Sequence, residues 1–137
     1  MVDEAVLTRS VADIRDAVAR IREVLPADVE DFERDRTTRE VVALNLFVSL
    51  QQALSLAAHW LAAEGRVAPT GYRAVFRALA EGAVLDRDLA ERLARAAGLR
   101  NIIAHRYGQL DWRTIHAIAS SDLDDLLSFC RQLAAKA

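Results

Sequence analysis

Polar side chains interrupt the apolar residues of the segment between residues 98 and 108. Arg100, Asn101, His105 and Tyr107 lie there among leucine, isoleucine and alanine residues of the kind that fill protein cores. A guanidinium is permanently charged and matches two phosphate oxygens, whereas an imidazole gains or loses a proton near neutral pH. A segment that served only packing would not need this combination, so we single it out as the candidate functional site.

Helical geometry limits which of these side chains can meet. At about 100° per residue, Arg100 and Tyr107 are roughly 20° apart and would share one stripe of a helix, whereas Arg100 and His105 are about 140° apart. Two explanations remain open for the second pair. The helix ends or distorts near Ala104, with Gly108 helping to terminate it, or the two side chains meet across an interface between copies of the chain.

The spacing of the motif is similar to a known family signature. Arg100, His105 and Tyr107 resemble the R-x4-H-x-Y motif of the HEPN superfamily, in its HepT-type ribonuclease toxin branch. The resemblance spans nearly the whole chain, because further features of that branch have counterparts here. These are an amphipathic first helix, the pair Asp31-Phe32, a long second helix, the pair Tyr72-Arg73 and the sequence Leu-Asp-Asp-Leu at 123–126.

The motif residues suit metal-independent cleavage of RNA. RNA carries its own nucleophile, the 2′-OH, so cleavage requires a base for that hydroxyl, a cation for the phosphorane oxygens and an acid for the leaving 5′-oxygen. We expect His105 to act as acid or base and Arg100 to hold the phosphate. Asn101 lies one turn before His105, where it can hydrogen-bond the imidazole and fix its tautomer.

The resemblance also implies a dimer and a partner protein. One motif has a single histidine, whereas acid and base act in opposite protonation states, so a homodimer that pairs two motifs would supply both. The resemblance implies that a minimal nucleotidyltransferase antitoxin attaches AMP to Tyr107 and blocks the site. The simpler interpretation is that Tyr107 only packs and donates a hydrogen bond. Arg106 either contacts substrate or pairs with an acid.

Two other functions stay open at this stage. The chain can be a non-catalytic helical subunit that binds a nucleotide or a nucleotidyltransferase, in which case Arg100 holds a phosphate and His105 is dispensable. It can also be a plain dimerisation module. We expect no cofactor and no metal, because the three histidines, His59, His105 and His116, are scattered and lack cysteines or paired carboxylates at ligand spacing.

Composition favours one soluble domain over residues 1–137. The chain is 53% hydrophobic, which is enough apolar material for a core. No uninterrupted apolar run approaches the ~18 residues of a membrane span, and the acidic start at residues 1–4 does not fit a secretory signal, so we expect a cytoplasmic protein without a membrane partner. The single cysteine, Cys130, lies among leucines and is predicted to be a buried thiol.

The formal net charge of −2 conceals an uneven distribution. Residues 66–113 carry nine arginines against five acidic residues, whereas residues 1–65 carry seven arginines against twelve acidic residues. The basic excess coincides with the segment that contains the motif. Attraction of phosphate can therefore be local in a slightly acidic molecule, unless the many arginines only reflect the composition of the source genome.

Apolar spacing predicts an all-α, HEPN-like, up-and-down bundle of four main helices plus short ones. The main helices are expected at about 4–25, 38–64, 86 into the motif, and 122–135, with one short helix after residue 71 and another that begins at residues 110–112. Residues 26–37 are predicted to be irregular.

The predicted helix ends rest on capping residues. Thr37 and Glu40 form a capping box for the long helix, Thr70 caps the following short helix, and Asp86 caps the helix that enters the motif. Gly98 lies inside a helical pattern and predicts either a close approach of helices or a bend. Polar residues of the long helix, Asn45, Gln52 or His59, either are buried and hydrogen-bonded or line a pocket that faces the motif.

Overall fold

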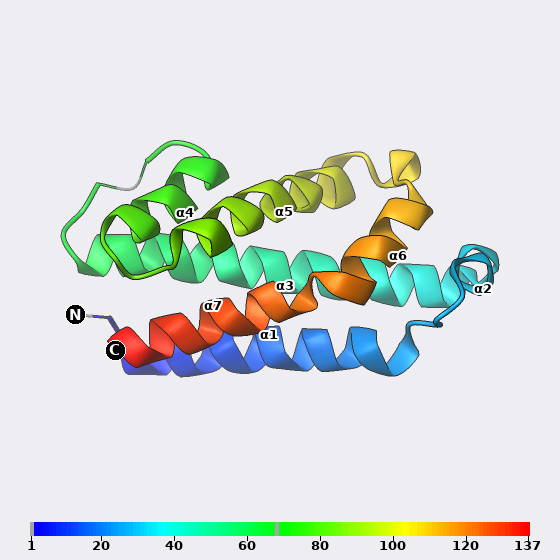
Figure 1. The fold of residues 1–137 in the computed structure, drawn as a ribbon, viewed down its shortest axis with the longest axis horizontal. Coiled ribbons are helices and arrows are strands. Elements are labelled where there is room, and N and C mark those ends of the chain that lie inside the picture. Colours follow the sequence, from blue (N-terminus) through cyan, green and yellow to red (C-terminus); the bar gives the residue numbers. More distant parts are fainter. Residues whose placement is uncertain (1, 68) are drawn as a thin grey trace.

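The computed structural model describes residues 2–67 and 69–137, and in this part of the chain it contains helices and no strand. In chain order the elements are α1 (Glu4–Val24), α2 (Val29–Arg34), α3 (Arg36–Ala63), α4 (Tyr72–Glu81), α5 (Arg87–His105), the 3₁₀ helix η1 (Tyr107–Gln109), α6 (Trp112–Ser121) and α7 (Leu123–Lys136). Successive long helices α1, α3, α5 and α7 run in alternating directions (Figure 1). The predicted all-α bundle is confirmed.

Helix α3 is the centre of the bundle, and α1, α4 and α5 pack around it. By length and composition alone α3 would be long enough to cross a membrane, since an 18-residue window in it has a mean hydropathy of 1.6. In the structure 44% of that window is buried by the surrounding protein. A helix that is apolar on several faces is typical of the centre of a bundle, and the packing here explains the composition of α3 in that way.

The segment between α1 and α3 is more ordered than the sequence predicts. Residues 26–37 were expected to be irregular, but Val29–Arg34 form α2, with Asp28 as N-cap through a hydrogen bond from the Glu30 N–H (2.8 Å). Phe32 on α2 is fully buried, and its ring lies 6.0 Å from that of Trp112 on α6. One aromatic side chain therefore holds α2 against α6.

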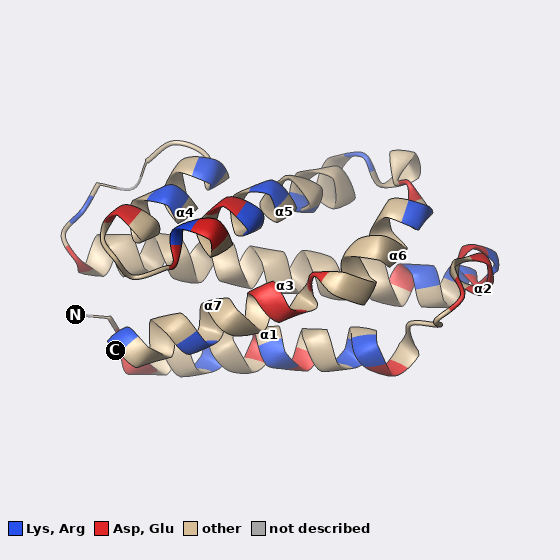
Figure 2. Cartoon of the chain, in the orientation of Figure 1, with Lys and Arg blue, Asp and Glu red and all other residues tan. Residues whose placement is uncertain are grey.

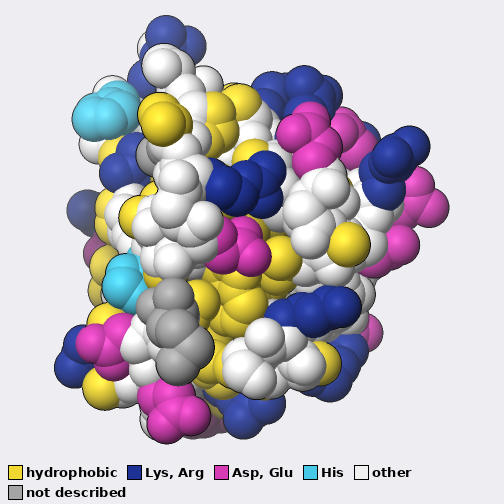
Figure 3. All heavy atoms as spheres, turned by 90° about the vertical axis from the view of Figure 1, so that its left-hand side faces the viewer, with side chains coloured by type: hydrophobic (Ala, Val, Ile, Leu, Met, Phe, Trp, Pro, Cys, Tyr) yellow, Lys and Arg dark blue, Asp and Glu magenta, His cyan; other side chains and the backbone are white. Residues whose placement is uncertain are grey.

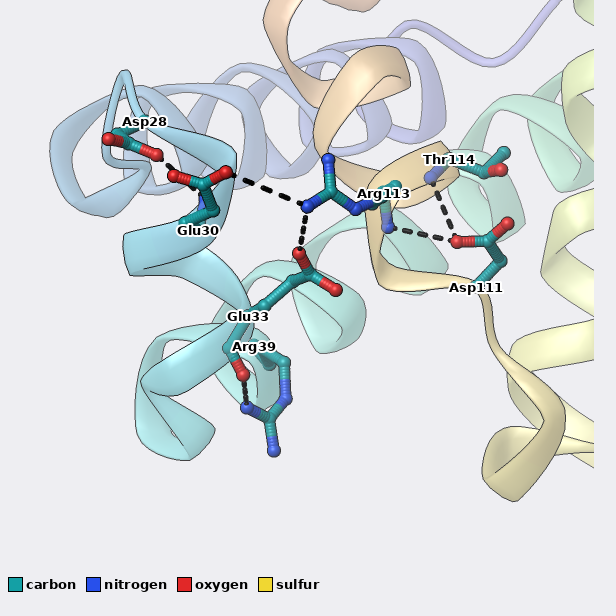
Figure 4. A network of polar contacts seen from close by, with 7 residues as sticks. All are labelled: Asp28, Glu30, Glu33, Arg39, Asp111, Arg113 and Thr114. Carbon is teal, nitrogen blue, oxygen red and sulfur yellow. Dashed lines mark hydrogen bonds and ion pairs between the residues drawn. The ribbon is translucent and has the colours of Figure 1, made fainter.

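Charged side chains reinforce the contact between α2 and α6. Arg113 of α6 lies between two carboxylates of α2, at 2.9 Å from Glu33 and 3.9 Å from Glu30 (Figure 4). The backbone carbonyl of Glu33 also accepts a hydrogen bond from Arg39 of α3. Three elements thus meet at the end of the bundle where α5 also ends (Figure 1).

The capping box predicted for the long helix, Thr37 with Glu40, is wrong. Helix α3 begins at Arg36 and its N-cap is Asp35, whose carboxylate accepts a hydrogen bond from the Thr38 N–H at 3.1 Å, so Thr37 does not cap it. Glu40 does not reach back to the backbone, because it accepts a hydrogen bond from Arg36 Nε at 2.7 Å. Asp35, two residues before Thr37, is an equally good N-cap, and with it the helix begins two residues earlier than predicted.

Helix α4 also starts without the predicted side-chain cap. Its N-cap is Gly71, with φ of 93°, rather than Thr70. Asp86 does cap α5 as predicted, through a hydrogen bond from the Leu89 N–H at 3.1 Å. Gly98 marks a close approach of α4 and α5, because a Cβ placed there would lie 3.0 Å from the Tyr72 hydroxyl oxygen.

At the opposite end of the bundle, beside both termini, hydrophobic side chains are visible between charged ones (Figure 3). The largest exposed apolar side chain in this region is Val67, which is 93% exposed in the connection between α3 and α4. This end is remote from the motif.

Candidate functional site

The motif spans the end of α5 and the short helix η1. Helix α5 ends at His105, Arg106 follows in a non-helical conformation (φ −138°, ψ 38°), and Tyr107 begins η1. The helix therefore ends one residue after Ala104, but His105 is still its last residue, so the end of the helix does not by itself remove the angular mismatch between Arg100 and His105. The predicted common stripe of Arg100 and Tyr107 is wrong, because Tyr107 is no longer on the same helix.

Arg100 is fixed in place by neutral groups. Its Nε donates to the side-chain oxygen of Gln51 on α3 at 2.6 Å, and its Nη1 donates to the Asn101 side-chain oxygen at 2.7 Å. The guanidinium carbon lies 5.6 Å from the centroid of the Phe47 ring. No carboxylate of the described residues pairs with it. The guanidinium is therefore oriented while its positive charge is left uncompensated.

This differs from other arginines in the basic segment. Figure 2 shows basic and acidic positions interspersed along α4, α5 and α6. Three arginines of this segment form ion pairs: Arg77–Glu91 (2.7 Å), Arg92–Asp125 (3.1 Å) and Arg113–Glu33 (2.9 Å). Much of the basic excess of residues 66–113 is thus neutralised within the fold. Arg100 and Arg106 form no ion pair in the described part of the chain.

The expected contact between Asn101 and His105 is absent from the described structure. Asn101 instead accepts the hydrogen bond from Arg100, so in one protomer it orients the guanidinium and not the imidazole. His105 is exposed at the last position of α5, and the next side chain, Arg106, is exposed as well. Neither side chain has a hydrogen-bond partner among residues 2–67 and 69–137. Both are accessible to a substrate or to a second protein chain.

Gln51 is a site residue that sequence reasoning missed. The sequence pointed to Asn45, Gln52 or His59 on the same helix, but Asn45 donates to the Val41 carbonyl of its own helix at 2.8 Å. Gln51 follows Phe47 by four residues, so both side chains lie on the stripe of α3 that faces Arg100. Helical spacing from Phe47 was the available signal, although the sequence does not show which stripe of α3 faces α5.

His59 and His116 lie apart from the motif. His116 Nε2 is 2.7 Å from the Pro26 carbonyl oxygen, which makes this imidazole a tie between α6 and the chain after α1. His59 is half-buried, and its Nε2 has no hydrogen-bond partner in the part of the chain that the structure describes. Among the described residues no three His, Cys, Asp or Glu side chains are grouped so that they could hold a metal ion.

Tyr107 lies in a partly enclosed, partly charged environment. Its ring packs edge-to-face on Trp112, with centroids 5.7 Å apart, and 42% of the residue is exposed. Burial, and secondarily the carboxylate of Glu40, raise the pKa of the phenol above its usual value, and the positive charges of Arg39 and Arg36 oppose this shift. The hydroxyl is therefore in its protonated form at neutral pH.

Apolar side chains around the motif remain exposed. Leu44 of α3 is 61% exposed and Ile102 of α5 is 40% exposed, although both belong to residue types that usually lie in the core. Leu44 lines a shallow pocket of about 260 Å³ together with Phe47, Ile103 and Tyr107. The surface around the motif therefore exposes more apolar side chain than is usual for a surface that contacts only water.

Comparison with known proteins agrees with this fold and this motif. A family model described as Ribonuclease HepT-like matches residues 14–133. The mRNA nuclease HepT of Shewanella oneidensis is 27% identical over 124 residues, which cover 90% of this chain and 92% of that protein. A solved structure of the tri-AMPylated Shewanella oneidensis HEPN toxin in complex with MNT antitoxin matches with a TM-score of 0.88 at 27% identity, over 98% of this chain and 99% of that one.

A more distant protein shares the fold alone. The cytosolic protein YutE of Bacillus subtilis, of unknown function, is 11% identical, with a TM-score of 0.86 over 98% of this chain and 90% of that one. The family model, in contrast, spans most of the chain and includes the whole motif from Arg100 to Tyr107. The resemblance to HepT-type proteins is confirmed, and this chain belongs to the HepT-like ribonuclease family.

Proposed function

We propose that this protein is a metal-independent endoribonuclease toxin that cleaves RNA by attack of the 2′-OH. The observation that carries the proposal is the environment of Arg100, whose guanidinium is held by the neutral oxygens of Gln51 and Asn101 and has no carboxylate partner among the described residues. A fixed, uncompensated guanidinium is suited to the developing charge of a phosphorane. The similarity to the mRNA nuclease HepT supports the same function.

In this mechanism Arg100 binds the scissile phosphate and His105 transfers protons. Acid and base must differ in protonation state within one turnover, so the two roles fall to His105 of each protomer of a homodimer. Asn101 acts as a positioning residue through Arg100, and the exposed Arg106 contacts substrate. The products carry a 2′,3′-cyclic phosphate and a 5′-hydroxyl.

The exposed apolar surface supports the homodimer. Leu44 lines a pocket with Tyr107 and is 61% exposed in the single chain, and Ile102, within the motif, is 40% exposed. Association of two copies through this surface would bury both side chains and bring two motifs together. In such a dimer Arg100 of one chain could act together with His105 of the other. Within one chain both residues lie on α5 but on different faces of it.

The proposed function includes control by a second protein. A minimal nucleotidyltransferase antitoxin transfers AMP to Tyr107, and the added phosphates compete with RNA at the site. The solved HEPN toxin with which this chain shares 27% identity is AMPylated and in complex with MNT antitoxin. Tyr107 is 42% exposed, so a modifying enzyme has access to it. We place this activity in a single cytoplasmic domain covering residues 1–137.

RNA cleavage by purified protein tests the catalytic part. Wild type, Arg100→Ala and His105→Ala, freed of partner and with an unmodified Tyr107 peptide confirmed by mass spectrometry, are incubated with RNA in excess EDTA. We expect cyclic-phosphate ends from wild type and at least a hundredfold loss of rate in both variants, as is typical when a positioned acid-base group or oxyanion partner is removed. Arg95→Ala, an exposed arginine on the same helix, is the matched control and should cleave normally.

Two results would overturn the catalytic proposal. Unmodified dimeric wild type that cleaves no RNA would favour a non-catalytic subunit that binds a nucleotide or a nucleotidyltransferase. The same conclusion follows if His105→Ala cleaves as fast as wild type. Activity that disappears in EDTA and returns with a divalent cation would contradict metal independence while leaving the ribonuclease in place.

A further inference from the structure

A second pocket adjoins Tyr107. It has a volume of about 520 Å³ and is lined by Arg36, Arg39, Glu40, Leu44, Tyr107, Gly108 and Trp112. This volume is within the range of about 300–1,000 Å³ that is usual for small-molecule sites. Gln51, Asn101 and Phe47, which surround Arg100, are not part of its lining.

The pocket combines positive charge with an aromatic wall. Arg39 donates to the Glu33 carbonyl, and its guanidinium carbon lies 5.4 Å from the centroid of the Trp112 ring, so the side chain is held in one position (Figure 4). The Nε of Arg39 is buried and has no hydrogen-bond partner among the described residues. Buried guanidinium nitrogens are normally satisfied, so this arginine retains unused capacity to donate.

Arg36 adds a second charge at the rim of the pocket. It donates through Nε to Glu40 at 2.7 Å and is largely exposed. Both arginines act on Tyr107 electrostatically, because each lowers the pKa of its phenol against the opposing effect of Glu40. The pocket thus carries two positive charges and one negative charge next to the phenol.

We propose that this pocket holds the nucleotide attached to Tyr107, a phosphodiester of adenosine, with its phosphate on Arg36 and Arg39 and its base against Leu44 and Trp112. The proposal rests on the modification of Tyr107 proposed above. In that modification the phenol oxygen forms a bond to the α-phosphorus of ATP, pyrophosphate leaves, and the phenol proton passes to solvent or to a base of the transferase. The pocket is a site for the product of this step.

The charge pattern favours a short nucleotide over an RNA strand. An RNA strand continues past a single phosphate and would meet Glu40 within the pocket, which repels further phosphates. A nucleotide on Tyr107 starts at the wall of the pocket and needs only one phosphate near the two arginines, with an apolar and aromatic surface for its base. Holding it there would make the modified state long-lived.

Enzymatic removal of AMP tests the proposal. Wild type, Arg36→Gln, Arg39→Gln and the control Arg34→Gln are each exposed to the cognate nucleotidyltransferase and ATP, and the mass of the Tyr107 peptide is measured. A phosphodiesterase that hydrolyses nucleotide esters is then added, and AMP release is followed with time. We expect release to be about tenfold faster from the Arg36 and Arg39 variants than from wild type, since each loses a charge-assisted contact.

The control and the second variant keep the result interpretable. Arg34 is an exposed arginine on α2 that does not line the pocket, so its variant should release AMP at the wild-type rate. Arg39 also contacts α2, and its substitution can disturb packing, whereas Arg36 is exposed and pairs with the nearby Glu40 of its own helix, so its substitution should leave the fold intact.

The outcomes separate this inference from the function on which it rests. Failure of wild-type Tyr107 to gain AMP would overturn both the proposed regulation and the pocket. Normal modification with equal release rates from wild type and both pocket variants would overturn the pocket alone. Equal release, combined with RNA cleavage reduced severalfold in unmodified Arg36→Gln and Arg39→Gln, would instead assign the pocket to RNA.

Discussion

The Arg100 side chain shows how a charge can be positioned without being neutralised. Arg92, two turns earlier on α5, is paired with the carboxylate of Asp125 at 3.1 Å, so its charge is largely cancelled. Arg100 is held by two amide oxygens and by the Phe47 ring, which fix its orientation while its net charge stays at +1. Such preorganisation reduces the reorganisation that the site needs when negative charge develops on a phosphate.

Removal of the Gln51 amide should weaken catalysis without removing the catalytic charge. In Gln51→Ala, Arg100 loses the acceptor of its Nε, and we expect kcat/KM for RNA cleavage to fall about tenfold, in line with about 1–1.5 kcal/mol for one hydrogen bond. Gln51→Glu should keep an acceptor for the Nε of Arg100 and so hold the guanidinium in place. Its carboxylate would neutralise the positive charge of Arg100, so this variant should also lose activity.

Gln52→Ala is the matched control for the same helix, because Gln52 is also half-buried but does not contact Arg100. Its cleavage rate should equal that of wild type. A lower rate in Gln52→Ala than in Gln51→Ala would show that the amide at position 51 does not position the guanidinium. Thermal unfolding of each variant separates these effects from loss of fold.

The Cys130 thiol should be unreactive in the folded protein. The side chain is fully buried in the core, and burial raises its pKa to about 11, so the thiolate fraction at pH 8 is very small. We expect a thiol reagent to label Cys130 only after unfolding, with a folded-state rate at least a hundredfold below that in denaturant. Rapid labelling of folded protein at pH 8 would contradict the buried position.

Residues of the site differ in how far the sequence reveals them. Arg100, His105 and Tyr107 stand out because their types and spacing form a motif. The role expected for Asn101 did not hold within one protomer, because its side-chain oxygen accepts a hydrogen bond from Arg100. Gln51 is 49 positions away from Arg100 in the chain, so its contact depends on how α3 and α5 are rotated against each other, and periodicity does not define that rotation.

The start of α3 is the sharpest difference between sequence and structure at the scale of an element. Both Asp35 and Thr37 are good cap residues, but only Asp35 accepts the Thr38 N–H. This hydrogen bond favours the charged carboxylate and lowers the pKa of Asp35 below its ordinary value of 3.8. A group with a lowered folded-state pKa stabilises the fold at neutral pH, and this contribution is lost as the pH falls through the folded-state value.

Asp35→Ala should therefore lower the melting temperature at pH 7 by about 2–5 °C, which is the usual scale for loss of an N-cap. The difference in melting temperature between variant and wild type should shrink as the pH falls below 3.8, because the Asp35 carboxylate of the wild type becomes protonated at its lowered pKa. Thermal unfolding followed by circular dichroism at several pH values measures both effects. Thr37→Ala tests the rejected cap, and an equal or larger loss of stability in that variant would refute Asp35 as the cap.

Long amphipathic elements could be predicted and short ones could not. The regular apolar spacing of 4–25 and 122–135 predicted α1 and α7 to within a residue or two. Helix α2 has only six residues, fewer than two turns, so it shows no periodicity, and it exists because Phe32 packs on Trp112 and Arg113 pairs with Glu33. These contacts are tertiary and lie about 80 residues apart in the chain.

At the scale of the whole molecule, the single chain leaves large apolar side chains exposed near its motif. The core is closed by α1, α3, α5 and α7, so the fold follows from the apolar pattern of one chain. Leu44 and Ile102 are not covered by any described element. Apolar periodicity distinguishes the buried face of a helix from its exposed face, but it does not show whether a second copy of the chain covers part of the exposed face. Leu44 lies on the same helix as Gln51, the partner of Arg100, so a second chain that covers Leu44 would lie near the arginine that we propose to be catalytic.

The substitution Leu44→Asp tests whether this surface joins two copies. A charge placed there would have to be buried unpaired in the dimer, which costs several kcal/mol, whereas in a monomer it is solvated because Leu44 is 61% exposed. We expect sedimentation to show a monomer with an unchanged melting transition and RNA cleavage to fall with the dimer fraction. Val67→Asp, at a 93% exposed position at the other end of the bundle, should remain dimeric and active. An active monomeric Leu44→Asp protein would mean that one chain supplies both proton transfers, and the two roles of His105 would then have to be divided between His105 and a group of the RNA or solvent.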